Sequence, residues 1–344
     1  PDSASKQGIY DKTNNASWTE AFYTGMVWLA YEVTNDEKYL TYAMEHMKSF
    51  EERICEKLHV DTHDLGFLYS LSCVAGYKIT GNETMKQIAL KAADELCKRY
   101  KPEGQFIQAW GDLNDKANYR LIIDCMNNLP LLYWASEVTG DQSYYDIAYT
   151  HAKTCLDVIV RADGSTYHTY FFDPETGKPD RGATFQGYSD DSCWARGQAW
   201  GISGVPLSYQ YTKDDRFIQY FKVLANYFLN RQPEDLVAYW DIVFTDGEEP
   251  RDSSASAIAV CGMLEMAKYL SGEEKELYTN AARGILNSLV DYYATSSEDD
   301  AQGLLLHGVY ALPLNVGIDE CTIFGDYYYM EALVRLYQDW KIYW

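Results

Sequence analysis

The sequence has no uninterrupted apolar stretch long enough for a membrane-spanning helix, and it does not begin with a signal-type segment. It is also poor in cations, because 29 Lys and Arg residues stand against 51 Asp and Glu residues and leave a net charge of −22. Binding to nucleic acid or to an anionic membrane depends on surplus positive charge. We therefore expect no nucleic acid and no membrane as partners, whereas a small anionic substrate is compatible with a local positive charge.

The eight cysteines are scattered through the 344 residues without a C-x-x-C pair. Such spacing argues against zinc and redox sites and favours reduced thiols, as in a bacterial cytoplasmic protein. The six histidines give no recognised metal-binding motif, so we expect neither a metal nor another cofactor. We expect a monomer or a weak homo-oligomer. Because the first residue is Pro rather than Met, removal of a leader segment stays open.

Aromatic residues are abundant, at 15% of the chain, with 31 Tyr and nine Trp. Flat aromatic side chains form stacking platforms for sugar rings, but they also fill the spaces between packed helices. For any single tyrosine, the packing interpretation is favoured.

Apolar residues recur at helical spacing in pairs of segments that a short polar turn separates. In the first pair, an apolar face from Trp18 to Val33 is followed by the turn TNDEKY and a second face from Leu40 to Ile54. This pattern predicts two antiparallel helices. Equivalent turns recur at Thr80, Thr139, Thr212 and Ser271, and a sixth first helix, YYYMEALVRLYQ, follows near the end. Repeats of this kind bury their faces against their neighbours.

Five complete hairpins and a truncated sixth predict an all-α fold, an (α/α)6 barrel, as a single catalytic domain over residues 1–344. No stretch of note alternates as a strand would, and the spacing of the turns varies too much for an open solenoid of the TPR kind. The longest connection, Arg161 to Asp190, is rich in Gly, Asp, Tyr and Thr. Long connections inside a compact domain are commonly functional.

Acidic clusters precede the first helix of successive pairs, in segments such as THDLGF, LIIDCMNNLP, YSDDSCWARGQAW and PRDSSASA. Equivalent helix ends meet at one mouth of a toroid, and the sequence therefore predicts that five acids converge there: Asp64, Asp124, Asp190, Asp191 and Asp252. For Asp64, in VDTHDLGFLYS, the alternative is a simple helix N-cap. Because acids recur before the first helix of successive pairs, the pattern favours a functional site over a simple N-cap.

Asp124 is flanked by Leu121, Ile122 and Ile123 on one side and by Cys125 and Met126 on the other. A carboxyl group in such surroundings, with a second acid nearby, is expected to have a raised pKa. A raised pKa is how a protein keeps a general acid protonated near neutral pH. The alternative is a hydrogen-bonded structural aspartate.

The segment SCWARGQAWG places Trp194 close to Arg196. An aromatic face beside a guanidinium suits a sugar ring that carries a carboxylate, although Arg196 could instead be an internal arginine paired with an acid. His168, in the long connection, either binds substrate or is an ordinary loop residue, and its position favours neither.

These residues resemble a known family, the unsaturated glucuronyl hydrolases of glycoside hydrolase family 88, which are close relatives of the unsaturated rhamnogalacturonyl hydrolases. The resemblance covers nearly the whole chain. It rests on five segments in order: SWTEAFYTGMVWLAYEVTNDEKY, HDLGFLYSLS, LIIDCMNNLPLLYWASEVTGD, FQGYSDDSCWARGQAWGI and GIDECTIFGDYYYMEAL. It implies an (α/α)6 barrel. It also implies an enzyme of polysaccharide and glycosaminoglycan degradation, whose substrates are lyase-generated oligosaccharides with a 4,5-unsaturated uronic acid at the non-reducing end.

The resemblance implies roles for individual residues. The acid and base is Asp124, which protonates C4 of the enol ether and helps deliver water to C5. The resulting hemiketal then collapses and releases the sugar. Asp64 holds substrate hydroxyls and raises the pKa of Asp124. The residues that match substrate-contacting positions are Trp18, Trp110, His168, Gln186, Trp194 and Arg196.

One segment departs from the family pattern. Members that favour sulfated fragments carry Ser-x-x-Ser-x-Lys just before a Gly-Val-Asp-Glu segment, whereas this chain has ALPLNV, with Ala311, Leu314 and Val316 in the three places, before GIDE. The groups that would hold a sulfate are missing. The sequence therefore predicts a preference for unsulfated disaccharides.

Other functions stay open at this point. One is the release of unsaturated galacturonate from rhamnogalacturonan fragments of pectin. Another is ordinary inverting hydrolysis on the same toroid. A third, from a different class, is a non-catalytic glycan-binding toroid, against which the presence of both Asp64 and Asp124 argues.

Overall fold

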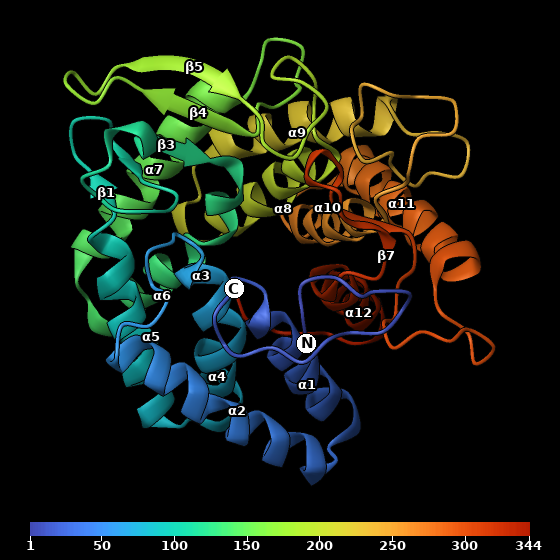
Figure 1. Ribbon diagram of the computed structural model, residues 1–344, viewed down its shortest axis with the longest axis horizontal. Coiled ribbons are helices and arrows are strands. Elements are labelled where there is room, and N and C mark those ends of the chain that lie inside the picture. The colour runs from blue at the N-terminus through green and yellow to red at the C-terminus, as the bar shows by residue number, and fades with distance from the viewer.

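Twelve α-helices dominate the computed structural model, which describes residues 1–344, and they follow one another around a ring (Figure 1). The helices are α1 (Glu20–Thr34), α2 (Glu37–Cys55), α3 (Leu65–Tyr69), α4 (Ala75–Thr80), α5 (Glu83–Cys97), α6 (Pro130–Thr139), α7 (Gln142–Ile159), α8 (Ala195–Thr212), α9 (Asp215–Asn230), α10 (Ser253–Ala267), α11 (Gly272–Ser288) and α12 (Ile323–Tyr337). A π-helical turn, η1 (Ser70–Val74), joins α3 to α4 into one inner helix.

The helices pack as five antiparallel pairs with a sixth inner helix. The pairs are α1 with α2, α3–α4 with α5, α6 with α7, α8 with α9 and α10 with α11. Helix α12 packs against both α10 and α1 and so closes the ring. The predicted (α/α)6 barrel is confirmed.

The turn within each of the first four pairs repeats one chemistry. In the turn after α1, the Thr34 hydroxyl donates to the Ala30 carbonyl, and Asn35 ends the helix in the left-handed region with φ 53°. Asp36 then caps α2 by accepting from the N–H of Lys38. The turns at Thr80, Thr139 and Thr212 likewise have a left-handed residue, Gly or Lys, followed by a capping Asn or Asp. The hydroxyls of Thr80 and Thr139 also donate to the carbonyl four residues earlier. A threonine, a left-handed residue and a capping Asp or Asn therefore reverse the chain in four places.

The core lies where the inner helices meet. Every residue of α10, from Ser253 to Ala267, is buried, whereas the outer helices bury only one face. Most of the buried hydrophobic residues, 89 of them, form one continuous cluster. This continuity supports a single domain, which stays a prediction. None of the helices is both long and apolar enough to cross a bilayer.

Seven short strands correct the expectation that the chain has no strands of note. They are β1 (Tyr100–Lys101), β2 (Phe106–Ile107), β3 (Arg120–Ile122), β4 (Thr169–Phe172), β5 (Pro179–Ala183), β6 (Gly308–Ala311) and β7 (Val316–Glu320). All pairings are antiparallel: β1 with β2, β4 with both β3 and β5, and β6 with β7.

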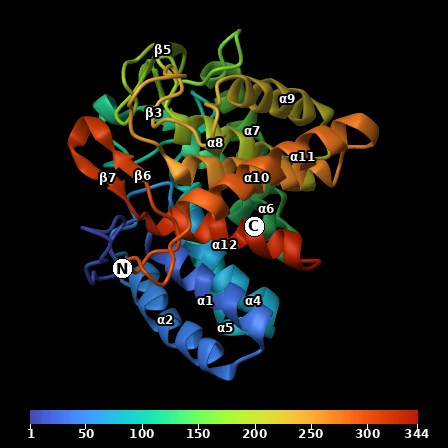
Figure 2. The same cartoon turned by 90° about the vertical axis from the view of Figure 1, so that its right-hand side faces the viewer.

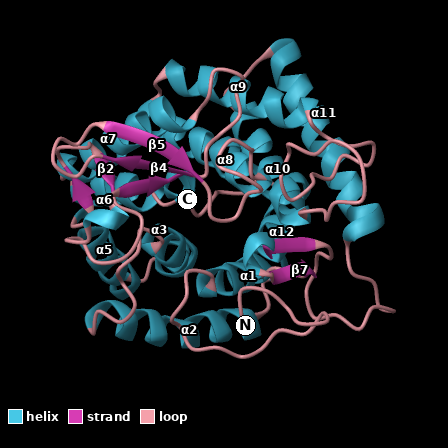
Figure 3. Cartoon of the chain, turned by 45° about the horizontal axis from the view of Figure 1, so that its top comes forward, coloured by secondary structure: helices cyan, strands magenta, loops and turns pink.

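The strands belong to the long connections between helical pairs, whose backbone groups need hydrogen-bond partners. In the side view they lie toward one face of the ring (Figure 2), and they form separate patches beside α7 and α12 (Figure 3). The longest connection, Arg161 to Asp190, is largely the β4–β5 hairpin.

Candidate active site

A cavity of 580 Å³ opens on the face that carries the strands. The eight residues to which the family resemblance gave catalytic or substrate-contacting roles all line it: Trp18, Asp64, Trp110, Asp124, His168, Gln186, Trp194 and Arg196. Seven of them come from the segment before α1 and from three connections, α2–α3, α5–α6 and α7–α8, and Arg196 lies in the first turn of α8. The ring therefore brings them together.

Asp124 follows β3 and lies in a short 3-10 turn, η3 (Ile123–Asn127), that leads into α6. The pairing of β3 with β4 fixes the chain before the turn, and the Asn127 amide donates to the Trp200 carbonyl on α8 after it. The Oδ1 atom of Asp124 is buried and has no hydrogen-bond partner. The alternative interpretation of Asp124 as a hydrogen-bonded structural aspartate requires a partner, and Oδ1 has none.

Asp64 directly precedes α3, but its side chain makes no capping hydrogen bond with that helix. Its Oδ2 accepts a hydrogen bond of 2.7 Å from the Thr62 hydroxyl, and its Oδ1 accepts one of 3.4 Å from the Asn128 amide. The Nε2 of His63 lies 3.4 Å from the same Oδ1. The N-cap interpretation of Asp64 is therefore wrong.

Gly66 allows the two aspartate segments to meet. A Cβ atom at this position would lie 2.2 Å from the Cα of Asn128. The Asn128 side chain accepts from the N–H of Phe67 at 2.6 Å and donates both to Asp64 and to the carbonyl of Asp124. The glycine of HDLGF is thus needed for a close approach of two backbones.

The two carboxyl groups differ in ionisation. Burial raises the pKa of Asp124 to about 8, the negative charge of Asp64 adds to the shift, and Arg196 opposes it. Burial also raises the pKa of Asp64, but hydrogen bonds from Thr62 and Asn128 limit it to about 6. Near neutral pH, Asp124 therefore keeps its proton while Asp64 is mostly ionised. Separated pKa values of this kind are typical of an acid paired with a charged partner.

Aromatic side chains form much of the cavity wall. The indole N–H of Trp18 donates to the Tyr310 hydroxyl at 3.0 Å, and Trp18 stacks on Phe324 with 5.3 Å between ring centroids. The Trp194 ring lies 4.5 Å from the His168 ring. These contacts hold the indoles in fixed orientations, as a platform for a sugar ring requires.

Trp110 also lines the cavity, with 37% of its surface exposed. The Arg120 guanidinium lies between two rings, 4.4 Å from the Trp110 centroid and 4.2 Å from that of Phe185. Burial lowers the pKa of Arg120 to about 10. Arg120 supports this wall from behind, and it does not line the cavity.

His168 is buried at the cavity wall, just before β4. Its Nδ1 accepts a hydrogen bond of 3.1 Å from the N–H of Phe185. Burial lowers the pKa of His168 to about 3, and the nearby charges of Arg196 and Arg120 act in the same direction. A neutral imidazole that accepts on Nδ1 carries its proton on Nε2, so the ring has one hydrogen bond to donate.

Arg196 on α8 has both terminal nitrogens engaged. Nη1 donates to Asp252 at 2.8 Å and to the Val309 carbonyl, while Nη2 donates to Gln186 at 2.7 Å and to the Tyr310 carbonyl. The paired-arginine alternative is therefore what the structure shows, and no edge of the guanidinium is free to bind a carboxylate bidentately. Arg196 orients Gln186 at the cavity. Its role in substrate binding stays a prediction.

The predicted convergence of five acids is wrong for three of them. Asp252 is fully buried against Arg196 and does not reach the cavity. Asp190 and Asp191 are exposed in the connection before α8, where Asp190 accepts a hydrogen bond from the N–H of Thr184. A local turn contact, which the repeat pattern does not encode, holds the Asp190 side chain, and neither aspartate lines the cavity.

His59 and His63 stand four residues apart. This is the H-x-x-x-H spacing of zinc sites on helices, so the statement that the histidines give no recognised metal-binding motif is wrong. Here both lie in the connection between α2 and α3, and Nε2 of His63 faces Asp64. No group of three His, Cys, Asp or Glu side chains is arranged to hold a metal ion.

Several further residues line the cavity that the sequence analysis did not assign to the site. They include Arg53, Thr62, His63, Phe185 and Tyr310. Thr62 and His63 adjoin Asp64 and were within reach of a sequence argument. Arg53 lies on an outer helix and Tyr310 on β6, and neither carries a local signal.

The chain has clear relatives. A family model described as Glycosyl Hydrolase Family 88 matches residues 2–340. An unsaturated chondroitin disaccharide hydrolase of Streptococcus pneumoniae is 49% identical over 100% of this chain and 88% of its own length. A crystal structure of unsaturated glucuronyl hydrolase from Streptococcus agalactiae matches with a TM-score of 0.98 at 50% identity, over 100% of this chain and 87% of that one. A mutant from the same organism, complexed with dGlcA-GalNAc6S, matches at 0.89 and 47% identity over the same shares.

Proposed function

The chain belongs to glycoside hydrolase family 88 and is a glycoside hydrolase of the unsaturated glucuronyl type, and from this premise we propose how its cavity works. The substrate is an oligosaccharide whose non-reducing end is a 4,5-unsaturated uronic acid. The enzyme hydrates the C4=C5 double bond and thereby releases this sugar. The observation that supports this proposal most directly is one protonated and one ionised carboxyl group in a single tryptophan-walled cavity.

In the proposed mechanism, Asp124 donates its proton to C4 of the enol ether, which leaves positive charge shared between C5 and the ring oxygen. Its carboxylate then takes a proton from the water that adds to C5. The hemiketal opens and expels the aglycone. One carboxyl group serves both steps because the first step leaves it in the basic form that the second needs. The separation rule for paired carboxylates in ordinary glycosidases does not apply.

Asp64 has two roles in this proposal. As an ionised carboxylate, it accepts hydrogen bonds from substrate hydroxyls, and its negative charge helps to keep the proton on Asp124. His168 has a hydrogen bond to donate, and Gln186, held by Arg196, offers an amide at the cavity. We assign these two side chains, with Trp18, Trp110, Trp194 and Arg196, to substrate binding.

The rim of the cavity supports a preference for unsulfated substrates. Leu314 lines the cavity and is 63% exposed, in the position where sulfate-accepting members carry a serine. Val316, 45% exposed on β7, replaces their lysine. Burying sulfate charge against these apolar side chains costs free energy, because neither side chain supplies the hydrogen bond or the charge of the residue it replaces.

A substrate panel tests the activity. We expect loss of the unsaturated-uronate absorbance with unsulfated chondroitin disaccharide and much slower loss with its 6-sulfated form. Faster loss with a rhamnogalacturonan disaccharide would favour the pectin-directed alternative. Products that retain the double bond would indicate ordinary glycosidase chemistry.

The sulfate preference has its own test in the triple variant Ala311→Ser, Leu314→Ser, Val316→Lys. Since a hydrogen bond to a charged group contributes roughly 1.5 kcal/mol or more, we expect the kcat/KM ratio of sulfated to unsulfated disaccharide to rise about tenfold. Equal turnover of both disaccharides by the unmodified enzyme would contradict the proposal.

We also propose a cytoplasmic location. All eight cysteines are free, and six of them are buried thiols, which suits a reducing compartment. A monomer or weak homo-oligomer stays a prediction, which sedimentation of the purified chain tests.

A further inference from the structure

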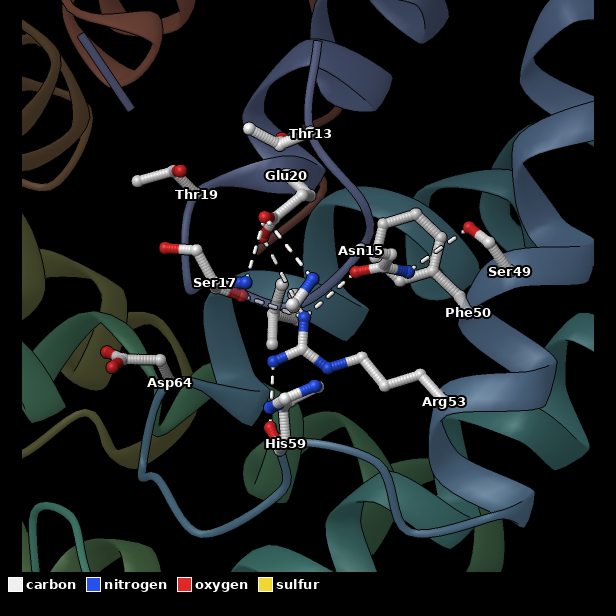
Figure 4. A network of polar contacts seen from close by, with 12 residues as sticks. Thr13, Asn15, Ser17, Thr19, Glu20, Ser49, Phe50, Arg53, His59 and Asp64 are labelled. Atoms are coloured by element: carbon white, nitrogen blue, oxygen red, sulfur yellow. Dashed lines mark hydrogen bonds and ion pairs between the residues drawn. The ribbon is translucent and has the colours of Figure 1, made fainter. Parts of the chain in front are cut away.

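Arg53, on the outer helix α2, reaches across to the cavity and lines it (Figure 4). Only 2% of the residue is exposed. Neither the family segments nor the helical repeats gave it a role. Its guanidinium lies near Asp64 in Figure 4, without a hydrogen bond between them. A buried arginine at this place requires an explanation, because burying a charge is costly unless it is well paired.

The Arg53 guanidinium ties together two segments that carry cavity residues. Nη1 donates to the Asn15 side chain at 2.8 Å and to the Ser17 carbonyl at 2.7 Å, directly before Trp18. Nη2 donates to the His59 carbonyl at 2.8 Å, in the connection that leads to Asp64. These bonds fix both segments relative to α2 (Figure 4).

The charge of Arg53 is only partly compensated. The Oε2 atom of Glu20 lies 3.8 Å from Nη1 and makes no hydrogen bond, while its Oε1 accepts from the N–H groups of Ser17 and Ala16. Nε of Arg53 has no hydrogen-bond partner. The other acceptors are neutral. The Arg53 charge therefore still acts on Asp64, whose pKa it lowers.

The charged and titratable groups around Asp64 come from several elements. On the positive side are Arg53 on α2 and Arg99 after α5, and Asp61 partly compensates Arg99. The remaining groups are His63 beside Asp64, Asp124 on η3 and Tyr310 on β6. Of the two arginines, only Arg53 lines the cavity.

We propose that Arg53 is a positioning residue of the active site, which holds the Trp18 and Asp64 segments in place and supplies positive charge that keeps Asp64 ionised while Asp124 retains its proton. This inference rests on the proposed function. In this proposal, the charge of a residue on an outer helix determines that Asp124, and not Asp64, carries the proton.

The proposal predicts a specific change in the pH profile of kcat. Activity requires an ionised Asp64 and a protonated Asp124, so the acid limb follows Asp64 and the alkaline limb follows Asp124. Removing the charge of Arg53 favours protonation of Asp64. The acid limb should move upward and the profile should narrow.

The experiment compares four enzymes on unsulfated unsaturated chondroitin disaccharide. In Arg53→Met we expect the acid limb to move up by roughly half a pH unit, less than a charge in direct contact would cause. In Arg53→Lys, which keeps the charge but loses the fork of hydrogen bonds, the limb should stay within about 0.2 units and KM should rise severalfold. In Glu20→Gln, which removes the opposing negative charge, the limb should move down.

Asn15→Ala is the matched control, because it removes one acceptor of the guanidinium and leaves every charge in place. Its acid limb should not move. An Arg53→Met enzyme that is slower at every pH, with both limbs unmoved, would show a merely structural role and overturn the proposal. If Arg53→Met does not fold, Glu20→Gln gives the test instead. An acid limb that does not move in Glu20→Gln would likewise overturn the proposal. An inactive wild type or an active Asp124→Asn would instead refute the proposed function, before any limb is compared.

Discussion

The two ends of the helical ring differ in how completely their polar groups are hydrogen-bonded. At the turn end, four of the five hairpins are reversed by a threonine, a left-handed residue and a capping side chain, and the polar groups of such a turn are hydrogen-bonded to neighbours within four residues. At the cavity end, Asp124 Oδ1, His63 Nδ1 and Arg53 Nε are buried without partners. The chain there is held by contacts between residues far apart in sequence.

The residues that stabilise the ring are therefore different from the residues that make the cavity reactive. Fully bonded turns favour folding and offer nothing to a ligand. Unpaired polar atoms destabilise the folded state, since an unsatisfied buried group costs roughly 1–3 kcal/mol, and they persist where a substrate can satisfy them. Substitutions at the two ends should therefore have different signatures.

The largest effect should come from Asp124→Asn. Asparagine keeps the shape of the side chain but cannot donate a proton to carbon, so kcat should fall by about 10³-fold or more. The same change in a turn, Asp141→Asn, retains a good N-cap residue and should leave turnover unchanged. Absorbance loss of the unsaturated substrate measures both. Full activity of Asp124→Asn would show that Asp124 is not the general acid.

Glycine-to-alanine changes sharpen the comparison through stability. Gly66→Ala would place a Cβ atom 2.2 Å from the Asn128 backbone, and we expect it to cost about 3 kcal/mol or more and to separate Asp64 from Asp124. At Gly81, in a turn with φ 70°, a Cβ atom meets nothing within 4 Å. Gly81→Ala should cost only about 1 kcal/mol of backbone strain and spare activity.

Urea unfolding and kcat of the two glycine variants give the measurement. A Gly66→Ala enzyme that keeps both its stability and its kcat would show that the close approach of the two segments has no role. Equal losses of stability at both positions would show that strain at the turn end had been underestimated.

Much of the turn end could be predicted from the sequence, because its interactions are local. The apolar spacing and the threonines at positions 34, 80, 139 and 212 located the hairpins, and the structure adds only which residue is left-handed. Asp124 was also within reach, since its apolar neighbours are adjacent in sequence and its burial follows from them.

The cavity end was less predictable because its contacts join distant segments. Arg196 was expected to be available to a substrate, but its partners Asp252 and Tyr310 lie 56 and 114 residues away. Asp190 and Asp191 matched the acidic pattern and are nevertheless held in a surface turn. The small sheets escaped notice because strands of two to five residues show too few alternations to be recognised.

The pH dependence of stability should have opposite signs at the two ends. Asp124 has a pKa of about 8 in the folded chain, and about 4 is usual in an unfolded one. The folded state therefore binds the proton more tightly, so wild type loses stability relative to Asp124→Asn as pH rises between these values and no further above them. Urea unfolding of both proteins across this range measures the difference. A constant difference would contradict the raised pKa.

Asp214, the cap of α9, provides the opposite sign. Hydrogen bonds from Arg216 contribute most to lowering its pKa, while partial burial opposes them. Wild type should therefore be more stable than Asp214→Asn at pH above about 4 and should lose this advantage as pH falls below that value. The same unfolding measurements, extended to acid, test it.

The smallest effect should come from removing a single cap. Asp141→Ala deletes the acceptor for the N–H of Ser143 at the start of α7, and a lost N-cap costs about 1 kcal/mol. Because the turn lies at the end of the ring away from Asp124, the kcat, the KM and both limbs of the pH profile should be unchanged. Thermal unfolding and steady-state kinetics on one preparation measure both. A shift in either pH limb would mean that the turn end affects the ionisation of Asp64 or Asp124. It would contradict the conclusion that the turn end contributes to stability alone.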